Sequence, residues 1–94
     1  MARVYAAWFE RSDWKEIKRL CADDLQDTFD EWLSDAQAGV KGVAAQGFLV
    51  EKIILTPDDI RQRQSATGRK VNASDRAQLA TAKGLEADNR GTQH

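Results

Sequence analysis

The sequence has few of the residues on which most protein chemistry depends. It contains one cysteine, Cys21, and one histidine, His94, which is the last residue. A transition-metal site needs several convergent cysteine, histidine or carboxylate ligands. A cysteine–histidine pair would have to use the terminal histidine. We therefore expect no metal site, no cofactor and no catalytic residue, and Cys21 is expected to be a buried, unreactive thiol.

Other absences limit the setting in which the protein works. A lone cysteine forms no internal disulfide, which fits a reducing compartment. No apolar run approaches the roughly 20 residues of a membrane helix, and the first residues contain no long apolar signal region. The net charge is −1, so no overall field attracts nucleic acid or an anionic membrane. A cytoplasmic protein without membrane contact is the expectation.

The composition is that of a small folded domain. The 94 residues are 41% hydrophobic and 31% charged, which is ordinary for a folded chain. The length predicts a single domain over residues 1–85, and the polar end predicts a flexible tail over residues 86–94.

Only two segments have the character of β-strands, residues 3–9 and residues 48–55. In the first, Val4, Ala6 and Trp8 would share one face, with Tyr5, Ala7 and Phe9 on the other. Two strands rarely form a stable sheet by themselves. We expect helices to cover them, or a second copy or a partner to complete the sheet.

Helical spacing and capping residues predict four helices, over residues 12–21, 25–46, 57–67 and 73–83. Thr28 with Glu31, Thr56 with Pro57, and Asn72 provide start signals, while Gly47 and Gly84 are placed to end helices.

The predicted fold is therefore α+β with the order β-α-α-β-α-α. The long helical connection favours a parallel, right-handed crossover, although an antiparallel pair stays open, and the sheet could be extended by dimerisation.

Charge is divided between the two halves of the chain, with a net −3 over residues 1–50 and a net +2 over residues 51–94. The acidic residues between Asp23 and Asp35 are most simply interpreted as the solvated face of a helix, and the alternative is a protein-docking surface. Most of the aromatic residues are expected to lie in the core, and if one of them is exposed we expect Trp8 or Trp14, because these two border charged sequence. The candidate protein-interaction residues are Trp8, Trp14, Asp23, Asp24, Asp27, Asp30 and Glu31.

The basic segment over residues 61–83 supports a second interpretation, nucleic-acid binding. The segment contains no aromatic side chain for base stacking, and its two helices are joined by too long a connection for a compact helix-turn-helix. The candidate residues are Arg61, Arg63, Arg69, Lys70 and Arg76.

The sequence thus favours a non-enzymatic protein-interaction domain that self-associates as a homodimer or acts as an adaptor. A nucleic-acid-binding accessory protein is the first alternative. A small inhibitor or adaptor carried by a mobile element is the second.

Overall fold

The computed structural model describes residues 2–23 and 25–92, with side chains up to residue 89. Within them the chain forms two strands, a short 3-10 turn and four α-helices. In chain order these are β1 (Arg3–Trp8), η1 (Arg11–Asp13), α1 (Trp14–Leu20), α2 (Phe29–Ala45), β2 (Leu49–Ile54), α3 (Pro57–Thr67) and α4 (Ala73–Thr92). The predicted α+β fold and its element order are confirmed.

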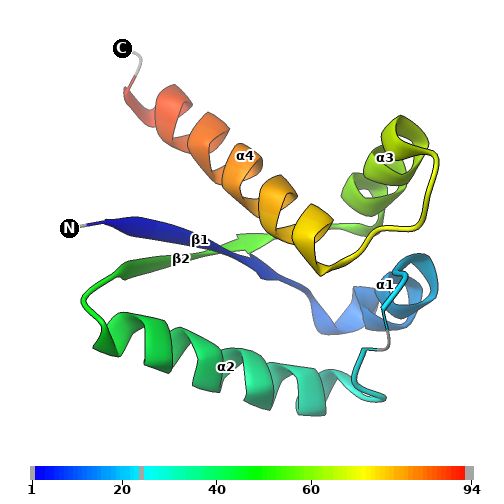
Figure 1. The fold of residues 1–94 in the computed structure, drawn as a ribbon, viewed down its shortest axis with the longest axis horizontal. Helices are drawn as coiled ribbons and strands as arrows, with labels where there is room; N and C mark the ends of the chain where they lie inside the picture. Colours follow the sequence, from blue (N-terminus) through cyan, green and yellow to red (C-terminus); the bar gives the residue numbers. More distant parts are fainter. Residues whose placement is uncertain (1, 24, 93–94) are drawn as a thin grey trace.

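The two strands pair in parallel, with Val4 beside Val50 and Trp8 beside Ile54. The parallel alternative of the sequence analysis is therefore correct. Helix α2 lies on one face of the pair and α4 on the other, which gives three layers (Figure 1). A short parallel contact between Cys21 and Val71 ties the end of α1 to the segment before α4, where the Ala22 amide donates to the Val71 carbonyl at 2.7 Å.

Local capping explains where three of the helices begin. The Thr28 hydroxyl accepts a hydrogen bond from the Glu31 amide at 3.1 Å. At α3 the cap is reciprocal, because the Thr56 hydroxyl accepts from the Asp59 amide while the Asp59 carboxylate accepts from the Thr56 amide. Asn72 and Asp75 form the same reciprocal pair at the start of α4. These predicted helix starts are confirmed.

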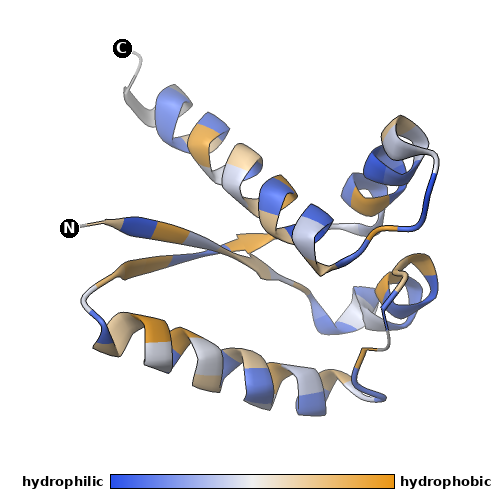
Figure 2. Cartoon of the chain, viewed as in Figure 1, coloured by the Kyte–Doolittle hydropathy of each residue, from blue (hydrophilic) through white to orange (hydrophobic). Residues whose placement is uncertain are grey.

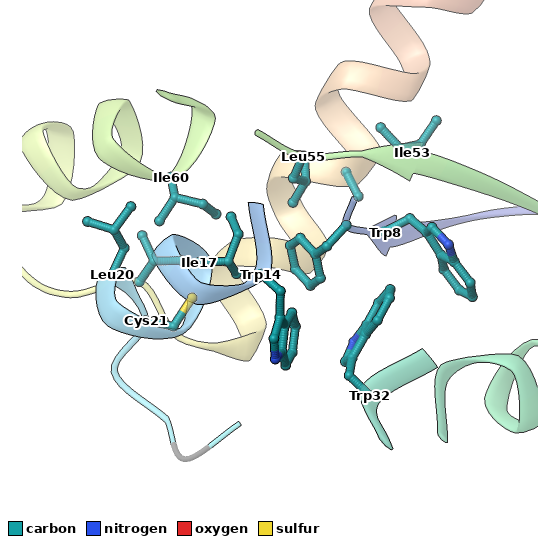
Figure 3. Close-up of a cluster of buried hydrophobic side chains, with 12 residues drawn as sticks. Trp8, Trp14, Ile17, Leu20, Cys21, Trp32, Ile53, Leu55 and Ile60 are labelled. Carbon is teal, nitrogen blue, oxygen red and sulfur yellow. The ribbon is translucent and has the colours of Figure 1, made fainter. Parts of the chain in front are cut away.

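The core is aromatic at one end and aliphatic at the other. Trp32 of α2 lies 5.0 Å from Trp8 and 5.5 Å from Trp14 between ring centroids. Beyond this cluster, Ile17 of α1 packs beside Ile60 of α3 (Figure 3). Helix α3 is mainly hydrophilic apart from Ile60, whereas the end of β2, which precedes it, is apolar (Figure 2). Helix α3 thus contributes little apolar surface to the core.

Several boundaries differ from the sequence prediction. Helix α2 begins at Phe29 rather than at residue 25, because Thr28 caps it. Strand β1 ends at Trp8, and the Phe9 ring contacts Trp32 of α2, 5.1 Å away, rather than continuing the alternation with Tyr5. Helix α1 begins at Trp14 after a 3-10 turn. Helix α4 does not end near Gly84 but continues to Thr92, so residues 86–92 are helical. A glycine between residues that favour helix is tolerated inside a helix when it permits close packing.

Candidate protein-interaction surface

The outer edge of β1 has unpaired backbone hydrogen-bonding groups. The Leu49 amide donates to the Ala2 carbonyl and the Leu55 amide to the Trp8 carbonyl, each at 2.9 Å. In a parallel ladder the two backbone groups of one residue point to the same neighbouring strand, and alternate residues point the opposite way. Arg3, Tyr5 and Ala7 therefore direct their amides and carbonyls away from β2, where the described part of the chain provides no third strand.

The outer edge of β2 is better protected. By the same alternation Val50, Lys52 and Ile54 direct their backbone groups outward, but the Ile54 carbonyl accepts a hydrogen bond from the Lys83 ammonium at 2.8 Å. The middle of this edge bears Lys52, whose ammonium lies 4.6 Å from the centre of the Trp8 ring. A charged side chain in the middle of an edge discourages further strand pairing. The β1 edge has no such protection over residues 4–8, which are uncharged.

On the α2 side, β1 borders an apolar hollow. Helix α2 packs mainly over β2, so the Val4 and Ala6 side chains are only partly covered. With Val50 of β2 and with Val40 and Val43 of α2 they line an open hollow of about 270 Å³. A strand added beside β1 would direct alternate side chains toward this hollow.

On the α4 side, a stripe of small and apolar residues lies above the same edge. Lys83 points toward β2, where it reaches Ile54, and Gly84 lies over Tyr5 of β1. Successive helical residues differ by about 100°, so Leu85 faces away from β2, beyond β1. Leu85 is 50% exposed and shares a shallow apolar surface with Thr81 and Ala77, one and two turns earlier. We call the unpaired edge of β1 and its two apolar borders the β1 edge surface.

The two tryptophans proposed as exposed contacts are instead buried. Trp8 is 9% exposed and Trp14 is 5% exposed, both within the aromatic cluster (Figure 3). The charged sequence beside them covers the cluster from outside, since Lys52 lies over Trp8 and Arg11 lies over Phe29 at 4.7 Å. The core interpretation is therefore confirmed for Trp8 and Trp14, and the alternative, that one of them is exposed, is wrong. The Trp14 indole N–H is buried without a hydrogen-bond partner among the described residues.

The acidic candidates do not form one surface. Asp23 accepts both guanidinium N–H groups of Arg76 at 2.7 Å, while Asp27 lies 3.6 Å from Lys18. Asp30 pairs with Arg11 at 2.6 Å, Glu31 helps cap α2, and Asp24 lies outside the described residues.

The basic candidates are largely paired within the chain. Arg61 bonds to Glu16 and Asp58, each at 2.9 Å. Arg63 and Arg69 both bond to the carboxylate of Asp75, which is 1% exposed and whose pKa is lowered to about 2 by these bonds, the one from Arg69 foremost. Arg76 is engaged by Asp23, and the Lys70 side chain is exposed. Acidic and basic side chains thus pair with each other inside one copy.

The groups that could support chemistry are likewise occupied or sequestered. Burial raises the pKa of the Cys21 thiol. A bond to the Asp88 carboxylate raises the pKa of Tyr5. No group of three or more His, Cys, Asp or Glu side chains converges as metal ligands among the residues described.

In the same part of the chain, no helix is both long enough and apolar enough to span a membrane. Searches with protein-family models, with curated proteins and with solved structures found no match to the chain.

Proposed function

We propose that the protein is a small, non-enzymatic protein-interaction domain that accepts a β-strand from a protein partner at the β1 edge surface. The observation that carries this proposal is the outward-facing backbone of Arg3, Tyr5 and Ala7, with partly exposed apolar side chains on both sides. Strand addition obtains affinity from main-chain hydrogen bonds and specificity from pockets that hold alternate side chains. The β1 edge surface has both the unpaired backbone groups for such bonds and apolar borders that could hold alternate side chains.

The state of the ionisable groups supports a binding role over a catalytic one. A general base works best with a pKa near the working pH, and a nucleophile needs an activated, accessible group. Here the pKa of Asp75 and that of Asp23 are lowered by arginine partners, and the pKa of Cys21 is raised by burial. These shifts move each group away from neutral pH.

The ion pairs also weigh against nucleic-acid binding through the basic segment. A phosphate contact requires a cation that can exchange its counterions for the phosphate. Arg76 is only 9% exposed and bound by two bonds to Asp23, and Arg63 and Arg69 share Asp75. Binding a phosphate would break these pairs and leave a buried carboxylate unpaired.

The test compares two lysine substitutions on neighbouring strands. Val4→Lys places a charge on the β1 edge surface, whereas Leu49→Lys places the same charge at an exposed position of β2 that lines neither apolar border. Tagged wild-type and variant proteins are used as baits in native lysate, with and without nuclease treatment. We expect the wild type and Leu49→Lys to retain the same protein, and Val4→Lys to lose it. Equal retention by both variants, or recovery of nucleic acid alone before nuclease treatment, would contradict the proposal.

A further inference from the structure

We infer that the strand added at the β1 edge is β1 of a second copy, paired antiparallel about a two-fold axis at Tyr5. This inference rests on the proposed function and names the partner for the same surface. The first reason is the chemistry of the edge. Residues 4–8 contain no charge, no proline and no glycine, so two copies can pair without burying a charge or losing a backbone donor.

The outward backbone groups match themselves across such an axis. With Tyr5 opposite Tyr5 of the second copy, Arg3 lies opposite Ala7, and each of these pairs exchanges two backbone hydrogen bonds, about six in all. Like charges do not meet, because Arg3 faces an alanine and stays paired with its own Asp88 at 2.7 Å. The pairing produces a four-stranded sheet in the order β2-β1-β1-β2, which removes the weakness of an isolated pair.

The α4 helices are suited to the same arrangement. An axis perpendicular to the sheet keeps both copies of α4 on one face. Asp88 contacts the start of β1 through Arg3 and Tyr5, so α4 runs antiparallel to β1 and the two α4 helices run antiparallel to each other. Neighbouring strands are about 4.8 Å apart and packed helices about 8–10 Å, so the two α4 helices fit above adjacent strands only if each leans toward its own β2 and the facing side chains are small. The sides that meet contain Ala77 and Thr81, and the exposed Leu85 gains apolar cover.

The β2 edge is a poorer alternative for self-association. Pairing there would displace Lys83 from the Ile54 carbonyl and bring the two Lys52 side chains close to each other. Phe48 and Leu49 are exposed where β2 begins, at the end of the strand and not along its outward backbone. The choice between the edges is therefore open to a direct test.

The test uses disulfide trapping of the purified full chain in a Cys21→Ser background. In the proposed register Val4 lies opposite Ala6 of the second copy as a non-hydrogen-bonded pair, with Cα atoms about 4.5 Å apart, a separation that a disulfide spans. The double variant Val4→Cys/Ala6→Cys should form a covalent dimer under mild oxidation. Glu51→Cys/Ile53→Cys, which flank the outward-facing Lys52 as Val4 and Ala6 flank Tyr5, is the matched control on β2 and should remain uncrosslinked. Crosslinking of the control pair alone would overturn the inference in favour of the β2 edge.

Sedimentation equilibrium gives an independent readout without cysteines. We expect the wild type and Leu49→Lys to dimerise, and Val4→Lys to dimerise roughly tenfold or more weakly, with an unchanged far-ultraviolet circular dichroism spectrum as evidence of folding. A purified wild type that stays monomeric into the high-micromolar range overturns self-association. If such a monomer still loses its lysate partner on Val4→Lys, the proposed function stands while this inference fails. If the lysate partner is retained, the proposed function fails as well.

Discussion

Gly84 of α4 lies directly against the aromatic ring of Tyr5 in β1, at a spacing that leaves no room for a side chain. A Cβ atom built at Gly84 would overlap the Cδ1, Cε1 and Cγ atoms of the ring, and Cγ is fixed close to the backbone. The glycine is therefore the residue that lets α4 settle onto β1. The Tyr5 hydroxyl bonds to Asp88 one turn later and holds the same contact.

We predict that Gly84→Ala destabilises the protein although alanine is the better helix former. The overlap with Tyr5 should cost about 1–3 kcal/mol, more than the roughly 1 kcal/mol of gained helix propensity. The matched control is Gly42→Ala in α2, where an added Cβ meets nothing within 4 Å and should stabilise by about 0.5–1 kcal/mol. Urea unfolding shows whether each variant has a higher or lower free energy of unfolding than the wild type. A stabilised Gly84→Ala would contradict the packing described.

The buried carboxylate of Asp75 should make stability depend on pH in a defined range. Bonds from Arg69 first, and from the Asn72 backbone and Arg63, lower its pKa from 3.8 to about 2. A carboxyl whose pKa is lowered by folding stabilises the fold above its ordinary pKa, and this contribution is lost as the pH falls from about 4 to 2. Asp75→Asn should therefore lower the urea midpoint at neutral pH, and the gap to the wild type should narrow near pH 2. Asp27→Asn, at a carboxylate that is 92% exposed, is the control and should change little at either pH.

The parts of the fold that could be predicted from sequence are those fixed by neighbours along the chain. Thr56, Pro57 and Asp59 set the start of α3 within four residues, and Gly47, with a φ of +95°, follows the end of α2. Likewise, the scarcity of strand-like sequence led to the expectation of two strands covered by helices, which the structure confirms.

What sequence reasoning missed depends on contacts between distant residues. Gly84 was interpreted as a helix end, because the residue that leaves room only for glycine there, Tyr5, lies 79 positions away in the chain. The basic segment resembled a free cationic surface because the partners of Arg61 and Arg76, Glu16 and Asp23, are 45 and 53 residues away. Which strand edge is unprotected follows only from the register, since one residue of slip exchanges the outward and inward backbone groups.

The thiol of Cys21 should react slowly in the folded protein. The side chain is buried, and burial raises its pKa, so both access and thiolate population are reduced. The rate with an aromatic disulfide reagent should be much lower in buffer than in denaturant. In a Cys21→Ser background, Ser12→Cys places a thiol at an exposed position and should react equally fast under both conditions. Fast native reaction of Cys21 would show that the contact between Cys21 and Val71 opens readily.

The ion pair between Asp23 and Arg76 should be asymmetric in its energetic effect. Its two bonds are both 2.7 Å long, but the Arg76 side chain is 9% exposed and the Asp23 side chain 37%. Removing Asp23 leaves a buried guanidinium without its partner, whereas removing Arg76 leaves a carboxylate that water can reach. Asp23→Ala should cost about 1–3 kcal/mol of unfolding free energy. Arg76→Met, which keeps the apolar stem, should cost less than about 1 kcal/mol. Chemical denaturation of both variants and of the double variant measures the order, and equal or reversed costs would mean that the pair is solvated in solution. The double variant should lose about as much unfolding free energy as Arg76→Met does. The destabilisation by Asp23→Ala comes from the unpaired Arg76 cation, which the double variant lacks.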